Sequence, residues 1–451
     1  MTTVASEISG ILWPPIHQSR QNPLQALLHH FDRIEQAPLT EITEGQERQL
    51  GALGAYLYEF SPLYRQRMFA AGLDPAAPLT LAMLGRLPPM TRRQLQQAGP
   101  AQFCSQVPAD HLPMGETRTS GSSGEPVVVH RTQVNQLFWL ANTMREHRWW
   151  QRDLTASLAI VRANLKEPYI RQNSWGPPAS LLGPSGPVHA FSMGLDTASL
   201  AQHLIAIQPH YLLIYPTALG DLLRHLHEQG STLSSLRQVR SIGETLGDEL
   251  RRAVRRQLGV EMVDSYSSQE VGVIAIQCPD SGLYHLMADN LIVEVLDEQG
   301  RACEPGEVGE VVITDLHNFA TPLLRYAIGD HAEVGSPCSC GRNLPTLRRI
   351  LGRSRNMLRY PDGSRRWPRV GFDRYRDVAP VRQYQLIQYA ADAIEMRLVV
   401  ERPLLDTEEA ALCRVVQEAL GFPFRLRFRY FDDNIPRSQG GKFEEFISQC
   451  E

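Results

Sequence analysis

The sequence has no large excess of charge of one sign and no long apolar run. Its formal net charge is −4 over 451 residues, which gives no electrostatic reason to expect a nucleic acid or an anionic membrane as partner. No apolar stretch approaches the roughly 20 residues that a membrane-spanning helix needs. The first residues, MTTVASEISG, lack the basic start and the apolar core of a secretory signal. We therefore expect a cytoplasmic protein that neither binds nucleic acid nor spans a membrane.

Cysteine occurs only seven times, and an odd number in a long chain argues against a disulfide framework. The sequence also has no internal repeat and no low-complexity tract. Hydrophobic residues make up 43% of the chain and charged residues 21%, which is ordinary for a soluble globular protein. Because 451 residues exceed what one core usually holds, we expect two or three domains.

Hydrophobic periodicity changes along the chain. The first hundred or so residues are mainly helical in pattern, as at residues 24–34 and 46–69. Thr91 is expected to cap a helix over residues 92–97, and Thr132 a helix that continues to residue 146. The middle of the chain alternates short apolar strands, such as residues 156–161 and 210–215, with helices. That alternation predicts an α/β fold with a mostly parallel sheet covered on both faces. From residue 291 onward, closely spaced strands indicate a β-rich subdomain.

The last hundred or so residues are expected to form a separate, small α+β domain. Apolar and polar residues alternate over residues 394–400 and 424–430, and a helix that Gly421 ends is expected between them over residues 408–420. We therefore predict a large N-terminal domain over residues 1–352 and a small C-terminal domain over residues 353–451.

The stretch RTSGSSGEP, at residues 118–126, is the most informative segment of the chain. Its glycines can turn successive backbone N–H groups toward one anion, and its hydroxyls add further donors. It is neither the common phosphate-loop motif nor a GxGxxG fingerprint. Two interpretations stay open, a phosphate cradle for ATP and a flexible turn or linker. The residues of the candidate cradle are Thr119, Ser120, Gly121, Ser122, Ser123 and Gly124.

Four further segments follow this loop in order. They are DSYSSQE at residues 264–270, HNFATPLLRYAIGD at 317–330, LGR at 351–353 and PRSQGGK at 436–442. The order and spacing of the five segments resemble the adenylate-forming superfamily, which includes acyl- and aryl-CoA synthetases, adenylation domains of nonribosomal synthetases, and luciferases. The sequences LPPMTRRQLQ, PLLRYAIGD and CSCGR narrow the resemblance to the phenylacetate-CoA ligase branch, and to its shorter, capsular-polysaccharide type of ligase-like protein.

This resemblance implies a fold and an activity. The fold would be a large adenylation domain, with mixed and parallel sheets flanked by helices and a β-rich subdomain, followed by a small mobile α+β domain. The enzyme would use ATP to convert a small carboxylic acid into an acyl- or aryl-adenylate and pyrophosphate. It would then transfer the acyl group to the thiol of CoA or of a carrier protein's phosphopantetheine. Charge builds up on the phosphates, so such catalysis depends on positioning and electrostatic neutralisation.

The resemblance also assigns residues to the nucleotide site. The glycine-rich loop would hold the terminal phosphates of ATP, and Tyr266, followed by Ser267 and Ser268, would lie against the adenine. Asp330 would accept both ribose hydroxyls, a task that suits a carboxylate because it only accepts hydrogen bonds. Arg325 belongs to the same block and is expected in this site. Without that block, Asp330 would be an ordinary turn residue after a glycine.

Three residues would act in catalysis. Glu270 would bind Mg²⁺, an ion that prefers oxygen ligands. Arg353, after the hinge glycine, would contact the nucleotide. Lys442 would bridge the substrate carboxylate and the α-phosphate. Taken alone, Glu270 could be a solvated acid at a strand end, and a lysine in a glycine-rich loop is ordinarily a surface charge.

The sequence departs from the family's pattern at three positions. Ser267 stands where a glycine is usual, Gln269 where a threonine is usual, and Asn356 where the hinge has an acid or a lysine. These departures leave open a catalytically weakened nucleotide-binding protein in a biosynthetic complex. The resemblance leaves a further alternative open, an adenylating enzyme that forms an amide or an AMP ester, as some relatives in this branch do. The acid itself is not identified, and we expect residues 164–193 to line part of its pocket.

A second group of residues could bind a metal ion. Cys278 and His285 lie in CPDSGLYH, and Cys338 and Cys340 lie in PCSCG. Three thiolates and one imidazole would make a closed tetrahedral set, typical of structural zinc. Neither spacing is the standard CxxC pair, so four unrelated residues, with Cys278 as a small buried hydrophobe, remain an alternative. Relatives in the branch carry similar pairs, so the resemblance implies a structural Zn²⁺.

Overall fold

The chain divides into two compact units. The computed structural model describes residues 6–17, 22–119, 127–353, 356–368, 372–437 and 443–450. The first unit comprises residues 1–246 and 250–350, and the second comprises residues 247–249 and 351–451. No helix within the described residues is long and apolar enough to cross a bilayer.

The first unit begins with helices whose apolar residues recur at helical spacing. These helices are α1 (Pro23–Ile34), α2 (Leu39–Phe60), α3 (Pro62–Ala70), α4 (Leu81–Arg86), α5 (Arg92–Gln97) and α6 (Pro100–Phe103), followed by a 3₁₀ turn, η1 (Ala109–His111). Thr91 caps α5 as the sequence predicts, because its side chain accepts from the backbone N–H of Gln94. Such caps fix where the chain enters each helix.

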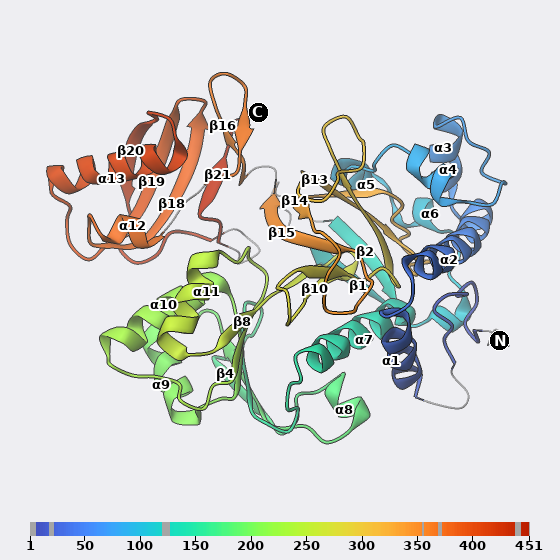
Figure 1. The fold of residues 1–451 in the computed structure, drawn as a ribbon, viewed down its shortest axis with the longest axis horizontal. Helices are drawn as coiled ribbons and strands as arrows, with labels where there is room; N and C mark the ends of the chain where they lie inside the picture. Colours follow the sequence, from blue (N-terminus) through green and yellow to red (C-terminus); the bar gives the residue numbers. More distant parts are fainter. Residues whose placement is uncertain are drawn as a thin grey trace. The chain divides into compact units, whose positions relative to one another are not determined.

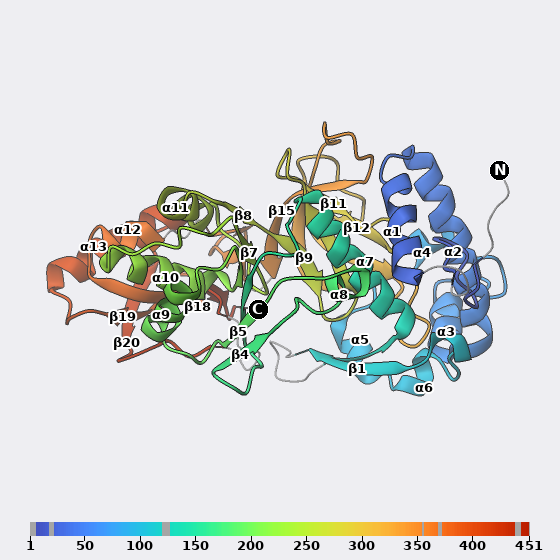
Figure 2. The ribbon, with the colours of Figure 1, turned by 90° about the horizontal axis from the view of Figure 1, so that it is seen from below.

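A hairpin and a long helix connect this region to the sheets. Strands β1 (Met114–Thr119) and β2 (Val127–Thr132) pair antiparallel. Thr132 then caps α7 (Gln133–Trp149) in a capping box with Asn135, which confirms the predicted start of this helix. Figure 2 shows α7 beside α1, and the rings of Phe31 and Phe138 meet between them at a centroid distance of 6.2 Å.

A six-stranded sheet carries the predicted βα alternation. Its order is β4-β5-β3-β6-β7-β8, and only the pair β4–β5 is antiparallel. The strands are β3 (Leu158–Arg162), β4 (Tyr169–Gln172), β5 (Val188–Ser192), β6 (Tyr211–Ile214), β7 (Gln238–Ser241) and β8 (Glu261–Val263), with the short helix α8 (Ala179–Leu182) after β4. Helices α9 (Thr197–Ile207), α10 (Pro216–Glu228) and α11 (Asp248–Leu258) pack their apolar residues against it (Figure 1).

A second, seven-stranded sheet forms the expected β-rich subdomain. Its order is β12-β13-β14-β15-β11-β10-β9. The strands are β9 (Ser265–Ser268), β10 (Gly272–Gln277), β11 (Tyr284–Leu286), β12 (Leu291–Leu296), β13 (Val308–Asp315), β14 (Tyr326–Val334) and β15 (Thr346–Arg353). Every residue of β10 is buried. The predicted α/β class, with a mostly parallel sheet and a β-rich subdomain, is confirmed.

The second unit is a small α+β fold. Its main sheet has the order β20-β19-β18-β21. The elements are β16 (Leu358–Arg359), β17 (Arg365–Arg366), α12 (Phe372–Arg376), β18 (Val381–Ala390), β19 (Ala393–Val400), α13 (Asp406–Leu420), β20 (Arg425–Tyr430) and β21 (Phe446–Ser448). Gly421 ends α13 at φ 69°, a left-handed conformation that glycine adopts without strain. The buried residues Leu398, Leu412 and Val416 belong to its core.

Candidate functional site

Two residues from separate motifs meet through a hydrogen bond between side chains on β9 and β14 of the β-rich sheet. Tyr266 on β9 is 7% exposed, and its hydroxyl donates to Oδ2 of Asp330 at 2.8 Å. Asp330 lies on β14 directly after Gly329, whose φ of 82° allows the strand to turn locally. The structure therefore brings the residue expected at the adenine next to the residue expected at the ribose. Ser267 is exposed beside them, and Ser268 Oγ accepts from the backbone N–H of Val271.

The structure describes only some of the other residues that are expected to bind the nucleotide or to act in catalysis. Thr119 ends β1 opposite Val127 of β2, at the base of the glycine-rich segment. Ser120, Gly121, Ser122, Ser123, Gly124 and Lys442 lie outside the described residues. Arg353 is the last residue of β15 and belongs to the second unit.

Arg325 is held within the protein. It is 5% exposed, and Nε and Nη2 donate to the carboxylate of Glu294 at 2.9 and 3.0 Å. Its Nη1 donates to the backbone carbonyls of Gly85 and Leu87. Four of the five guanidinium N–H groups thus have protein partners. These contacts give Arg325 a positioning role at the start of β14, the strand that carries Asp330, and its expected contact with the nucleotide stays a prediction.

Glu270 lies in a buried turn between β9 and β10. Its side chain is 4% exposed and forms an ion pair with Arg92 of α5, with 3.5 Å between Nη1 and Oε1. Arg131, on β2, donates to the backbone carbonyls of Ser268 and Gln269. Arg131 therefore fastens the turn that presents Glu270.

A polar pocket opens beside this turn, and we call it the Glu270 pocket. Residues from β2, α7, β10, β13 and the turn before β12 line it. They are Arg131, Asn135, Trp139, Asn142, Glu270, Val271, Gly272, Val273, Asn290 and Asp315. Apart from Glu270, the sequence motifs did not indicate these residues, because they come from segments that carry no motif. None comes from residues 164–193, where a pocket wall was expected.

Asp315 is the second carboxylate of the Glu270 pocket. It is 2% exposed, and its Oδ1 accepts from the backbone N–H of His317 at 2.9 Å. Burial raises the pKa of Asp315 to about 6, against the opposing effects of that hydrogen bond and of Arg131. Asn290 also contacts His317, with 3.0 Å between Oδ1 and Nδ1. The pocket thus gathers two carboxyl groups and three side-chain amides, whose oxygens are ligands of the kind that Mg²⁺ prefers.

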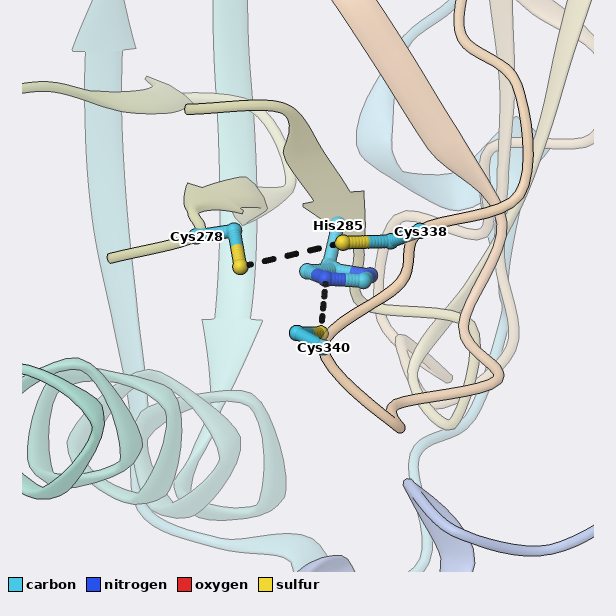
Figure 3. Close-up of side chains that lie close together, drawn as sticks. All are labelled: Cys278, His285, Cys338 and Cys340. Carbon is cyan, nitrogen blue, oxygen red and sulfur yellow. Dashed lines mark hydrogen bonds between the residues drawn. The ribbon is translucent and has the colours of Figure 1, made fainter. Parts of the chain in front are cut away.

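Figure 3 shows Cys278, His285, Cys338 and Cys340 gathered from two parts of the β-rich sheet. Cys278 follows β10, His285 lies on β11, and the other two cysteines lie on the loop between β14 and β15. Their four donor atoms all lie within 4.8 Å of one another. The Sγ atoms of Cys278 and Cys338 are 3.9 Å apart. Two sulfurs bound at about 2.3 Å to one tetrahedral zinc would be roughly 3.8 Å apart, so the spacing fits this ion.

The surroundings orient these four residues. Nδ1 of His285 lies 3.2 Å from the backbone carbonyl of Leu344, and its other nitrogen, Nε2, lies 3.3 Å from Sγ of Cys340. A histidine that binds a metal through one ring nitrogen usually donates a hydrogen bond from the other, and here Nδ1 of His285 faces the carbonyl of Leu344 in this way. The backbone N–H of Arg342 donates to Cys340 Sγ at 3.5 Å. A metal here would join the β10–β11 hairpin to the β14–β15 loop. Such a link between two segments would give the metal a structural role.

Comparison with known proteins gives concordant results. Residues 117–320 match the family model described as AMP-binding enzyme. The phenylacetate-coenzyme A ligase of Thermus thermophilus is 28% identical over 72% of this chain and 73% of its own. The phenylacetate-coenzyme A ligase of Escherichia coli is 27% identical over 73% of this chain and 75% of its own. A crystal structure of 2-hydroxyisobutyryl-CoA ligase with 2-HIB-AMP covers 93% of this chain and 92% of its own, at 20% identity and a TM-score of 0.73.

We predict that the purified chain contains about one zinc ion per molecule, measured by plasma mass spectrometry. Cys338→Ser should lower the zinc content and reduce the melting temperature by about 5 °C or more, because the metal joins two separate segments. Cys413→Ser, in the second unit and outside the set, is the matched control. A protein without stoichiometric zinc, in which Cys338→Ser is as stable as the wild type, would rule the site out.

We also predict a pH-dependent effect of Asp315→Asn on the free energy of unfolding. Because burial raises the pKa of Asp315 in the folded protein from 3.8 to about 6, the stability contributed by its proton is present below pH 4 and is lost as the pH rises through 6. The full loss is about 2–3 kcal/mol. Asparagine keeps the acceptor for His317 but cannot ionise. In urea titrations the variant should gain stability relative to the wild type between about pH 4 and pH 6, the interval between the two pKa values, and a stability difference that stays constant across this interval would contradict this.

Proposed function

We propose that this chain, which matches the AMP-binding enzyme model over residues 117–320 and is similar to phenylacetate-CoA ligases, is an ATP-dependent carboxylate–thiol ligase. A carboxylate oxygen of the acid attacks the α-phosphorus of ATP, and pyrophosphate leaves. The sulfur of CoA, or of a carrier protein's phosphopantetheine, then attacks the acyl carbon, and AMP leaves as the thiol proton is lost. The hydrogen bond between Tyr266 and Asp330 is the observation that carries the proposal, because it joins two motifs 64 residues apart.

Tyr266 and Asp330 would bind the nucleoside. The ring of Tyr266 supplies an apolar face for the adenine. Its hydroxyl occupies one acceptor position on Oδ2 of Asp330. A carboxylate only accepts hydrogen bonds, which suits Asp330 to the two ribose hydroxyls. Thr119 and the glycine-rich segment that follows it would bind the phosphates.

Glu270 would hold Mg²⁺, with oxygens of Asp315 and Asn290 in the same pocket. When bound, the ion neutralises charge on the phosphates of ATP. Arg92 balances the charge of Glu270 at 3.5 Å, and Arg131 fixes the backbone of the turn. These two arginines therefore place the carboxylate before any ligand arrives.

Lys442 would act in the adenylation step. The sequence contains 45 lysines and arginines together, yet lysine occurs only at positions 166 and 442. The compact ammonium group of a lysine fits between a carboxylate and the α-phosphate, where a planar guanidinium is less suitable. The second unit carries Lys442 and Arg353, and we propose that it turns at residues 352–358 so that one face serves adenylation and another serves thiol transfer.

The first test is a screen for acid-dependent ATP–pyrophosphate exchange, with aromatic, fatty and amino acids as substrates. We expect exchange with a subset of these acids and formation of the CoA thioester from the same subset. Nucleotide binding without any acid-dependent exchange would favour the catalytically weakened protein. If the protein supports exchange but forms only an amide or an AMP ester and no thioester, this would favour an adenylating enzyme of that kind.

The second test is Lys442→Ala, which should reduce exchange by about 10²-fold or more, because it removes charge stabilisation at the α-phosphate. Thioester formation from a supplied acyl-adenylate should be retained, since that step does not need this contact. Lys166→Ala replaces the only other lysine, which is exposed, and is the matched control. Equal loss of both steps in Lys442→Ala would contradict the assigned role.

A further inference from the structure

The hairpin that carries two of the four candidate metal ligands is bonded to the chain just before Tyr266. We call residues 277–285 the metal hairpin, since Cys278 lies near its beginning and His285 at its end (Figure 3). Two other side chains of the metal hairpin form hydrogen bonds with Asp264. Asp264 lies between β8 and β9, two residues before Tyr266. The metal hairpin therefore contacts the chain next to the residue proposed to bind the adenine.

Gln277 forms the first link and continues the pairing of β9 with β10. The backbone pairing of these strands ends at Ser265 and Ile276. Beyond this pair, Oε1 of Gln277 accepts from the backbone N–H of Asp264 at 3.0 Å. Its Nε2 donates to the backbone carbonyl of Gly282, in the turn of the metal hairpin, at 3.2 Å. One amide, on a residue that is 9% exposed, thus joins this turn to the start of β9.

Tyr284 forms the second link. It is 6% exposed, and its hydroxyl donates to Oδ2 of Asp264 at 2.9 Å. The same hydroxyl accepts from Nη2 of Arg251 at 2.8 Å. Ser241, at the end of β7, donates to the other carboxylate oxygen of Asp264. Because both oxygens are bonded, the carboxylate is held between β7 of one sheet and β11 of the other.

A metal would restrict the metal hairpin at both ends. Cys278 directly follows Gln277, and His285 directly follows Tyr284. Fixing a ligand residue reduces the conformations open to the adjoining backbone, so each linking side chain would have to sacrifice less conformational entropy to reach Asp264. With the metal removed, the metal hairpin loses its connection to the loop between β14 and β15. Its two links to Asp264 then have to be held by packing and hydrogen bonds alone.

We infer that Gln277 and Tyr284 are positioning residues that couple metal binding at the Cys/His set to nucleotide binding at Tyr266. The inference rests on the proposed function, because Tyr266 has to lie against the adenine, and on zinc being the metal of the set. The coupling passes through the hydrogen bonds of Asp264. Coupling between two binding sites is reciprocal, so zinc strengthens nucleotide binding by the same factor by which the nucleotide strengthens zinc binding.

The first test measures the Kd of AMP by calorimetry, for the protein as purified and after a chelator has removed its zinc. AMP is the probe because it contains the adenosine that Tyr266 and Asp330 would bind, and because it can be measured without Mg²⁺. The Kd should be at least about fivefold higher without zinc, which is the lower end of ordinary coupling between sites, and added zinc should restore it. An equal Kd in both states, or a protein that holds no zinc, would overturn the inference and leave the proposed function intact.

The second test removes one link at a time from the zinc-loaded protein. Tyr284→Phe loses one hydroxyl and Gln277→Met loses the amide, while all four metal ligands remain. Both variants should keep about one zinc ion per molecule and bind AMP more weakly than the wild type. In Tyr284→Phe, removal of zinc should raise the Kd of AMP by no more than about twofold, because the coupling energy is lost with the link.

Tyr211→Phe is the matched control. Tyr211 is 5% exposed, and its hydroxyl accepts from the backbone N–H of Asp153 at 2.9 Å rather than bonding Asp264. This variant loses a hydroxyl from a similarly buried tyrosine, so it should lower the melting temperature to a similar extent. It should keep both the wild-type Kd of AMP and the wild-type effect of zinc on that Kd.

These measurements distinguish a positioning role from a merely structural one. If Tyr284→Phe and Gln277→Met lower the melting temperature but bind AMP as the wild type does, the inference is wrong. Should the zinc-free protein unfold, the chelator concentration that removes half of the zinc provides the answer, because AMP should raise it in the wild type and raise it less in Tyr284→Phe. If the zinc-loaded wild type does not bind AMP, the proposed function fails, and the inference fails with it.

Discussion

The contacts between Arg131 and the backbone of the β9–β10 turn are the constraint on which the site depends. Arg131 on β2 donates to the carbonyls of Ser268 and Gln269, so it joins the hairpin after the glycine-rich segment to the turn that presents Glu270. Tyr266 precedes this turn on β9 and is itself fixed by its hydrogen bond to Asp330. Even a half-buried guanidinium such as that of Arg131 needs partners for its N–H groups, and the carbonyls of this turn provide them. The residues proposed to bind the nucleotide are thereby fixed by contacts within the protein.

The Cys/His set acts on a different part of the same sheet. It joins the end of β10 and β11 to the loop between β14 and β15, and Asp330 lies on β14. A metal at these four residues would stabilise the sheet that carries both Tyr266 and Asp330, while lying on other segments than the Glu270 pocket.

Local features of the structure could be predicted from the sequence, because each depends on residues that are neighbours in the chain. The alternation of strands and helices, the caps at Thr91 and Thr132, and the glycine that ends α13 are each decided within one or two helical turns. The motif residues were likewise identified one segment at a time. Their roles came from resemblance to a family, and the structure adds that the motifs of Tyr266 and Asp330 meet.

The sequence by itself determined the α/β class, the order of the elements and the candidate residues within the motifs. Only the tertiary structure decided that Arg325 supports β14 through Glu294, and that Asn142 and Asp315 share a pocket with Glu270. The reason is physical. Periodicity and capping are set by residues close in sequence, whereas the surroundings of a buried polar group are set by how distant elements pack against one another.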